Sequence, residues 1–266
     1  MERHAVYGLA VPERGWVPAP RYALRRQRVL RLTRDLPPGA LLEVGCGAGA
    51  LLADFAARGF ACTALETSDA ARAVALHVHR GDPSVRILAA PEPGWESAFD
   101  VLVALEVLEH IADDAAALRL WRSWLRPGGT LVLSVPARQK LWSASDVWVG
   151  HFRRYERAPL LHLLAATGFA IEHAECYGFP LANWTEAARA RAHARRLRRL
   201  GEARAVAERA AHTAASGVER SAESRVYRLQ ASLPGTLAFR ACGWLQERFL
   251  ERDWGTGLLA LARRSG

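Results

Sequence analysis

Three glycines and one glutamate carry the clearest chemical signal in this chain. Gly45, Gly47 and Gly49 directly follow one apolar run, and Glu66 directly follows another. Because glycine lacks a Cβ atom, such a turn adopts positive φ angles and lets a ligand approach the backbone closely. A carboxylate at the end of a neighbouring strand accepts hydrogen bonds from both hydroxyls of a ribose. The pattern predicts a strand-turn-helix unit that binds a nucleoside.

A second group of reactive side chains lies in the segment that ends at Tyr155. His151 is the side chain there that accepts a proton near neutral pH, so we predict it as a general base. Asp146 or Tyr155 would orient it. A network of Arg153, Arg154 and Asp146 that only holds the loop together explains the same residues. Aromatic side chains of this segment are suited to wall a pocket: Trp142, Trp148, Phe152 and Tyr155.

Strands and helices must alternate to bring these side chains together. Apolar runs bounded by glycine and proline alternate along the chain with segments of helical periodicity. This order is typical of an α/β fold, in which helices cover both faces of a mainly parallel sheet. We expect strands at 41–45, 61–66, 85–89, 99–105, 130–135 and 169–176, and helices at 21–33, 50–58, 69–79, 113–125 and 157–167.

Three ordered motifs carry a family resemblance. The spacing Glu-x-Gly-x-Gly-x-Gly from Glu43 resembles motif I of the class I S-adenosylmethionine (SAM)-dependent methyltransferases, and differs from the G-x-G-x-x-G of nicotinamide and flavin binders. Residues 97–111 resemble the family's fourth strand and following helix, and residues 125–136 its L-x-P-G-G turn and fifth strand. The run D-x-x-x-G-H-x-R-R-Y from Asp146 is similar to one in many bacterial members. The nearest analogy is the type 11 group, which includes ubiquinone-pathway O-methyltransferases.

The resemblance implies a fold, a cofactor and a set of binding residues. The fold is a seven-stranded, Rossmann-like, doubly wound sheet with strand 7 antiparallel, and residues 253–263 resemble that last strand. The cofactor is SAM, which leaves as S-adenosylhomocysteine. Arg25 or Arg26 resembles an arginine that reaches the SAM carboxylate, although a solvated helix face explains both equally. The other implied cofactor residues are Glu43, Gly45, Cys46, Gly47, Gly49, Glu66, Thr67, Ala90, Leu105, Glu106 and His110.

The resemblance assigns each of these residues to a different part of the cofactor. Glu43 would hold the turn or the methionine ammonium, and Thr67 would lie beside the adenine. Ala90 stands where relatives often carry an aspartate for the adenine amine, so a backbone group or Glu92 would supply that contact. His110 begins the helix after the fourth strand, where a structural or cofactor-side role is expected.

The expected organisation is one core with two additions. We expect an N-terminal helical cap at 1–40, the SAM-binding core at 41–180, a mainly helical insertion at 181–252 and the final core strand at 253–266. The insertion begins with an Ala/Arg-rich part, 185–215, predicted as a long exposed helix or partly disordered. Its second part would pack on the core, act as a lid, form a dimer contact or lie on a membrane surface. Its apolar residues are Leu237, Phe239, Trp244, Leu245, Phe249 and Leu250.

The net charge of +9 and the pI near 10.2 do not by themselves indicate a nucleic-acid partner. Residues 1–183 hold 20 basic against 19 acidic side chains, whereas residues 184–266 hold 16 against 8. Lys140 is the one lysine among 36 basic residues, which indicates a compositional bias. We expect no nucleic-acid partner. A peripheral membrane contact and a homodimer stay open.

The cysteines indicate a reduced compartment, and the apolar runs indicate whether the chain is exported or spans a membrane. The four cysteines stand alone with no C-x-x-C spacing, which favours cytoplasmic thiols and argues against zinc, and we expect no metal. No secretory segment and no apolar run near 18 residues occurs, so we expect neither export nor a membrane span.

Three functions fit the pattern. The first is methyl transfer from SAM to an oxygen or nitrogen atom of a small molecule, in secondary metabolism. The second is an RNA or protein methyltransferase whose Arg-rich insertion holds the polymer. The third is a non-catalytic SAM-fold partner. Because phosphate contacts release counterions, polymer binding weakens steeply with salt, which separates the second function from the first.

Overall fold

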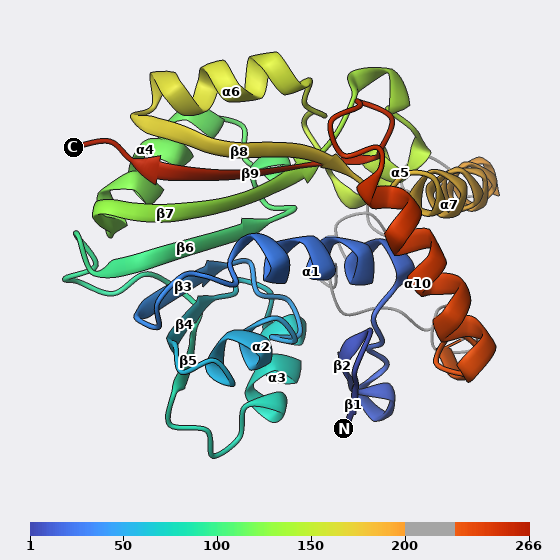
Figure 1. The fold of residues 1–266 in the computed structure, drawn as a ribbon, viewed down its shortest axis with the longest axis horizontal. Helices are drawn as coiled ribbons and strands as arrows, with labels where there is room; N and C mark the ends of the chain where they lie inside the picture. Colours follow the sequence, from blue (N-terminus) through green and yellow to red (C-terminus); the bar gives the residue numbers. More distant parts are fainter. Residues whose placement is uncertain (200–226) are drawn as a thin grey trace.

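A seven-stranded mixed sheet forms the centre of the molecule (Figure 1). The computed structural model describes residues 1–199 and 227–266. The strand order is β5-β4-β3-β6-β7-β9-β8, and β9 is antiparallel to both of its neighbours. This confirms the predicted doubly wound α/β fold with an antiparallel last strand. The strands are β3 (Ala40–Val44), β4 (Ala61–Leu65), β5 (Val85–Leu88), β6 (Phe99–Leu105), β7 (Leu125–Pro136), β8 (Phe169–Tyr177) and β9 (Gly257–Arg264).

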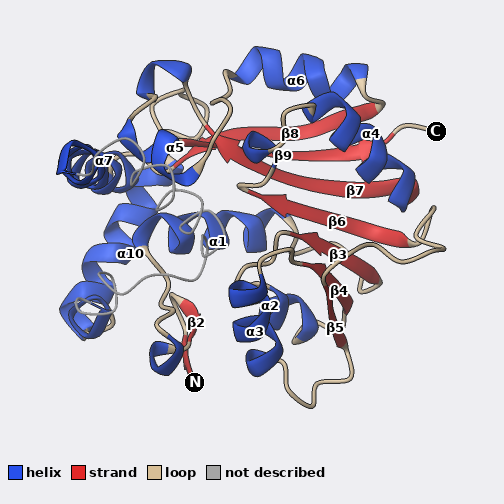
Figure 2. Ribbon diagram, turned by 180° about the vertical axis from the view of Figure 1, so that it is seen from behind, coloured by secondary structure: helices blue, strands red, loops and turns tan. Residues whose placement is uncertain are grey.

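Both faces of the sheet are buried under helices. Alternate residues of one strand serve opposite faces, so Leu41 packs with Val29 and Phe55 while Leu42 packs with Leu118 and Leu160. Helix α1 crosses one face (Figure 1), and α4 and α6 lie against the other (Figure 2). The core helices are α1 (Pro20–Leu32), α2 (Leu52–Ala56), α3 (Asp69–Val78), α4 (Asp114–Trp124), α5 (Ala144–Val149) and α6 (Arg157–Ala166).

The N-terminal segment is not wholly helical, which corrects the predicted cap at 1–40. A hairpin of β1 (Glu2–His4) and β2 (Gly8–Ala10) and the 3-10 turn η1 (Pro12–Arg14) precede α1. Short strands of this kind lack the long alternating pattern that marks a core strand in a sequence. Apolar side chains of the segment cover the glycine-rich turn and α3, in a cluster of Leu9, Val11, Trp16, Ala48, Ala50, Ala71 and Val74.

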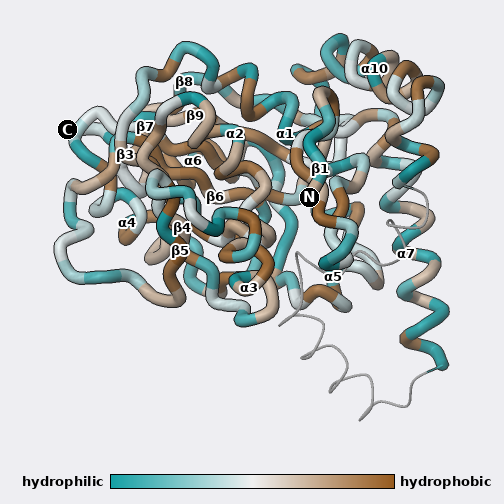
Figure 3. The backbone as a smooth tube through the Cα atoms, turned by 90° about the horizontal axis from the view of Figure 1, so that it is seen from below, coloured by the Kyte–Doolittle hydropathy of each residue, from teal (hydrophilic) through white to brown (hydrophobic). Residues whose placement is uncertain are grey.

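The insertion between β8 and β9 contributes two described helices, α7 (Leu181–Arg199) and α10 (Leu233–Glu247). Residues 200–215 of the predicted Ala/Arg-rich helix lie outside the described residues. Figures 1 and 3 place both helices at one end of the molecule, and hydrophobic colour in Figure 3 concentrates on the sheet. In α10, Phe239 is buried but Leu237 and Trp244 are exposed, so the predicted packing face is only partly used.

The ends of the insertion are tied to the sheet. Gln246 of α10 is buried, and its Oε1 accepts a hydrogen bond of 2.6 Å from the backbone N–H of Gly178. The final strand begins at Gly257, four residues after the predicted start. None of the described helices is long and apolar enough to span a lipid bilayer.

Candidate active site

The glycine-rich turn lies at the carboxyl end of β3, where ligands of α/β sheets bind. Gly45, Gly47 and Gly49 have φ angles of 71°, 56° and 71°. A Cβ atom on Gly45 would lie 2.5 Å from Cγ2 of Val107, so only glycine fits there. The backbone N–H of Gly45 donates to the carbonyl of Leu65 over 2.7 Å, which joins the turn to the end of β4.

Glu66 holds this turn in place. One carboxylate oxygen accepts the N–H of Gly47 and the other accepts the N–H of Ser68, each over 2.8 Å. The side chain is 8% exposed, so both charge-assisted hydrogen bonds are shielded from water. Each oxygen keeps acceptor capacity, which fits the two hydroxyls of the ribose that Glu66 is predicted to bind.

Glu43 of β3 lies two residues before the turn and has an unused acceptor. Its side chain is 4% exposed, and its Oε2 has no hydrogen-bond partner among the described residues. Burial raises the pKa of Glu43 to about 8, although the charge of Arg25 opposes the shift. A cationic group next to this carboxylate would favour its ionised form. The orphaned oxygen therefore fits the methionine ammonium of SAM.

His79 supports the turn from α3. Its Nε2 lies 2.8 Å from the carbonyl oxygen of Gly49, and the ring is buried. Cys46, between the glycines, is also buried, and burial raises the pKa of its thiol. A neutral thiol in this position is a packing group, and the predicted contact of Cys46 with the cofactor stays a prediction.

The side of the site predicted to hold adenine is exposed at Thr67 and Ala90. Glu92 is held by Arg86 in an ion pair of 2.9 Å. Leu105 is buried at the end of β6, directly before Glu106. The contacts of these residues with the cofactor stay predictions.

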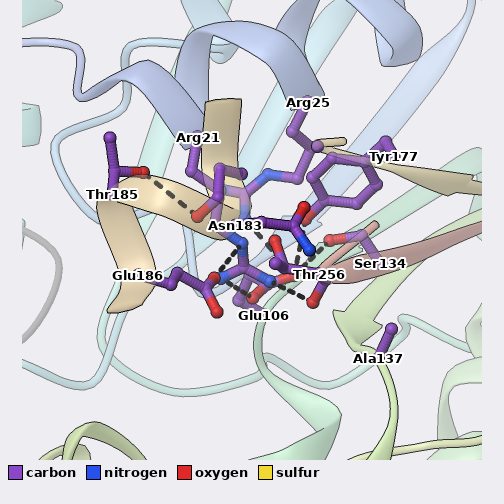
Figure 4. Close-up of polar contacts among 12 residues, drawn as sticks. Arg21, Arg25, Glu106, Ser134, Ala137, Tyr177, Asn183, Thr185, Glu186 and Thr256 are labelled. Carbon is purple, nitrogen blue, oxygen red and sulfur yellow. Dashed lines mark hydrogen bonds and ion pairs between the residues drawn. The ribbon is translucent and has the colours of Figure 1, made fainter. Parts of the chain in front are cut away.

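Glu106 is the centre of a buried polar cluster (Figure 4). Its Oε1 accepts hydrogen bonds from the hydroxyls of Ser134 and Tyr177, over 2.8 and 3.0 Å. Arg21 reaches the other oxygen at 2.6 Å, and Arg25 lies 3.5 Å from Oε1. Burial disfavours the charge on Glu106, but Arg21 and Arg25 outweigh it and lower the pKa to about 2. Glu106 therefore stays ionised.

The same cluster joins the core to the insertion. Arg21 also pairs with Glu186 of α7 at 2.8 Å and donates to the carbonyl of Thr256, just before β9. Glu106 has a φ of 61°, which is unusual for a residue with a side chain. Its hydrogen bonds and ion pairs hold it in this conformation.

Arg26 does not reach this cluster, which corrects its predicted role at the SAM carboxylate. Its guanidinium makes two hydrogen bonds of 2.6 and 2.7 Å to the carboxylate of Asp54 in α2. Neighbouring residues of a helix point about 100° apart, so Arg25 turns to the site while Arg26 turns to α2. The Nε of Arg25 is buried and has no hydrogen-bond partner among the described residues. Arg25 is thus the better candidate for the SAM carboxylate.

His151 and Asp146 are brought together as predicted, but Tyr155 is not. The Nδ1 of His151 lies 2.9 Å from Oδ1 of Asp146, which also accepts from Arg154 over 2.7 Å. Asp146 closes a capping box at the start of α5. The hydroxyl of Tyr155 instead donates to Asp114 of α4 over 3.0 Å, so Tyr155 cannot orient His151. The backbone of Tyr155 pairs with Ala137, the residue directly after β7, and not with α5. This pairing turns the ring of Tyr155 away from His151.

His151 faces the 3-10 turn η2 (Leu108–His110). Its Nε2 lies 3.7 Å from Oε1 of Glu109, and its ring meets that of His110 edge-on at 4.7 Å. Burial and the nearby His151 lower the pKa of His110 to about 4, so His110 is neutral. These contacts argue against His151 as a general base.

Comparison with known proteins agrees with this geometry. A family model described as a methyltransferase domain matches residues 19–174. The chain belongs to the class I SAM-dependent methyltransferases. This confirms the resemblance read from the three motifs.

Curated O-methyltransferases match part of this chain. A ubiquinone biosynthesis O-methyltransferase of Xanthomonas campestris pv. campestris is 38% identical over 108 residues, 37% of this chain and 44% of that protein. One of Azotobacter vinelandii is 39% identical over 102 residues, 35% of this chain and 43% of that protein. The chain thus spans less than half the length of each of these two relatives.

The fold is shared with proteins of more than one activity. A SAM-dependent methyltransferase structure from Mesorhizobium loti matches with a TM-score of 0.55 at 18% identity, covering 92% of this chain and 98% of that one. The [4+2]-cyclase SpnF matches with a TM-score of 0.55 at 21% identity, covering 99% and 87%. The fold alone does not determine the reaction.

Sequence reasoning missed several residues of this methyltransferase site. Tyr177 ends β8 and Ser134 lies two residues before the end of β7, and β9 runs antiparallel between these two strands. Their shared place at the carboxyl ends of strands is a signal that could have put both at the ligand edge. Arg21 lies one helical turn before Arg25, which would have placed the two arginines on one face of α1. For His79 we see no such signal, because a histidine at the end of a helix has no distinctive spacing.

Proposed function

We propose that this chain is an enzyme that transfers a methyl group from SAM to an oxygen or nitrogen atom of a small molecule, in a pathway of secondary metabolism. The observation that carries the proposal is the glycine-rich turn held by Glu66 next to the unpartnered carboxylate oxygen of Glu43. Together they offer acceptors for two hydroxyls and an ammonium, the polar groups of SAM. When bound, SAM supplies a methyl group activated by the positive sulfur.

In this proposal the side chains of the site mainly position SAM and the acceptor. An in-line displacement needs the nucleophile, the methyl carbon and the sulfur in one line, so alignment supplies much of the rate. In this proposal Glu66 fixes the ribose, Glu43 the ammonium and Arg25 the carboxylate. Arg21 and Glu186 close the edge of the site over Glu106.

The acceptor is proposed to lie beside Glu106. Arg21 and Tyr177 contact that residue at the carboxyl edge of the sheet. The names of the relatives, which refer to O-methyl transfer in ubiquinone biosynthesis, support a hydroxyl oxygen as the accepting atom.

Transfer of labelled methyl groups tests the proposal. Purified chain would be incubated with SAM carrying a tritium-labelled methyl group and a panel of phenols, alcohols and amines. We expect labelled small-molecule product, no product with Gly47→Arg, and near-normal product with the control Gly81→Arg. Gly81 has a φ of 79° and open space around it, so the control makes the same substitution in a similar conformation away from the site.

The salt dependence of turnover separates the alternatives. Turnover of a neutral small acceptor should change little between 50 and 200 mM salt, whereas a protein with roughly six phosphate contacts loses about 10³-fold in affinity. Label entering RNA or protein with that steep salt dependence would contradict the proposal. S-adenosylhomocysteine binding without any methyl transfer would instead support the non-catalytic alternative.

A further inference from the structure

Three potential metal ligands meet between η2 and the loop after α5. Glu109, His110 and His151 each offer one ligand atom, and these atoms lie within 4.8 Å of one another. The two segments are fastened together beside them, because the backbone N–H of Phe152 donates to the carbonyl of Glu109 over 2.8 Å. The cluster is therefore built into the fold and is not a chance meeting of surface side chains.

Glu109 is buried without compensation. It is 0% exposed, and neither carboxylate oxygen has a hydrogen-bond partner in another described residue. Nε2 of His151 lies 3.7 Å from Oε1. A carboxylate in such surroundings is costly to bury unless a cation or donor faces it. One of its oxygens and one ring nitrogen of each histidine lie within 4.8 Å of one another.

His151 is oriented by an acceptor on its far side. Its Nδ1 faces Asp146, itself fully buried and held by Arg154. When one ring nitrogen donates in this way, it carries the proton and leaves the other with a free lone pair. Metal-binding histidines are commonly supported in this manner.

We propose that Glu109, His110 and His151 bind one divalent transition-metal ion. Two imidazole nitrogens and one carboxylate favour an ion of the Zn²⁺, Mn²⁺ or Fe²⁺ class over Mg²⁺ and Ca²⁺, which prefer oxygen ligands. The ligand atoms would move together by about 1 Å, because bonds from nitrogen to zinc are ~2.1 Å long. A metal ion at this site would contradict the sequence prediction that the chain binds no metal. His151 would then be a metal ligand and not a general base. The proposal goes beyond methyl transfer and does not depend on it.

Metal binding by the whole, untagged chain tests the proposal. After treatment with a chelator, Zn²⁺ and Mn²⁺ would be titrated by calorimetry, and Co²⁺ by its visible absorption. We expect one ion per chain, with the dissociation constant at least 100-fold higher for Glu109→Gln and for His151→Ala. His162→Ala, which removes an exposed histidine of α6, should bind like wild type.

Stability gives a second readout if a variant folds poorly. Zn²⁺ should raise the melting temperature of wild type and of His162→Ala, but not that of Glu109→Gln. The absence of a one-to-one site in wild type would overturn the proposal, as would unchanged binding by Glu109→Gln. S-adenosylhomocysteine binding would be measured in the same samples. If the chain binds S-adenosylhomocysteine but no metal ion, the metal site is refuted and the proposed function stands. If it binds the metal ion but not S-adenosylhomocysteine, the proposed function is refuted and the metal site stands.

Discussion

At the scale of single residues, the two glutamates beside the glycine-rich turn, Glu43 and Glu66, have different roles. Glu66 is ionisable but already satisfied by the N–H groups of Gly47 and Ser68, so it shapes the turn before any ligand arrives. Glu43 is buried with one oxygen unused, so it is ready for a cation. Both features give predictions that single substitutions can test.

Removing the Glu66 carboxylate should weaken the cofactor site strongly. Glu66→Ala deletes the acceptors proposed for both ribose hydroxyls and frees the N–H of Gly47. Since hydrogen bonds to a charged group contribute about 1.5–3 kcal/mol each, we expect affinity for S-adenosylhomocysteine to fall at least about 100-fold. Calorimetry would measure the change, with exposed Glu96→Ala as control. A loss of less than threefold would remove Glu66 from the ribose site.

Glu43 should make the stability of the ligand-free chain depend on pH. Its folded-state pKa of about 8 lies above the ordinary value of 4.5, so the folded state holds the proton more tightly. This contribution is complete below pH 4.5, declines as pH rises towards 8 and is then lost. One group changes the free energy of unfolding by up to about 1.4 kcal/mol per pH unit within that window.

Glu43→Gln should remove this slope. Urea unfolding of wild type and variant at pH 5.5, 6.5 and 7.5 would show the difference. We expect the variant to lose less stability than wild type as pH rises. Parallel pH profiles would mean that Glu43 titrates normally in the folded chain.

At the scale of elements, α1 distributes its arginines to different parts of the molecule. Arg25 turns to Glu106, Arg26 to Asp54 of α2, and Arg28 to buried Glu175 of β8 over 2.7 Å. The helix therefore links the sheet, the glycine-rich turn and the site. Substitutions at neighbouring positions should have different consequences.

Arg26→Met should reduce stability more than cofactor affinity. Among the residues that the structure describes, it leaves the 7%-exposed carboxylate of Asp54 with the 3.6 Å contact to Arg3 as its one ion pair. Breaking a buried ion pair costs about 3–5 kcal/mol, so we expect a loss near the lower end in urea unfolding. Arg25→Met, the matched comparison, should weaken S-adenosylhomocysteine binding by about tenfold with a smaller loss of stability. The reverse order of effects would restore Arg26 to the cofactor site.

The sequence predicted regular elements well and side-chain partners less well. Strands such as Phe99–Leu105 have the predicted bounds because long apolar runs between turn residues leave few alternatives. The roles of Arg26 and Tyr155 were wrong because they depend on which way a helix or loop faces, and a sequence does not contain that rotation. Asp146 was placed correctly next to His151, since the capping box at Ser143 fixes it locally.

At the scale of the whole molecule, the site is where three distant parts of the chain meet. The carboxyl ends of β3, β4 and β6 supply the turn, Glu66 and Glu106, α1 supplies the arginines and α7 supplies Glu186. The sheet order was predictable from the family resemblance. The N-terminal hairpin over the turn and the docking of α7 were not, because both depend on packing between parts far apart in sequence.

A crystal structure of the chain with S-adenosylhomocysteine tests the central claim most directly. We expect the ligand along Gly45, Gly47 and Gly49, with both ribose hydroxyls within hydrogen-bond distance of Glu66. We also expect the amino group of the ligand beside Glu43. Ligand bound elsewhere, or a ribose that leaves Glu66 bonded only to Gly47 and Ser68, would contradict it.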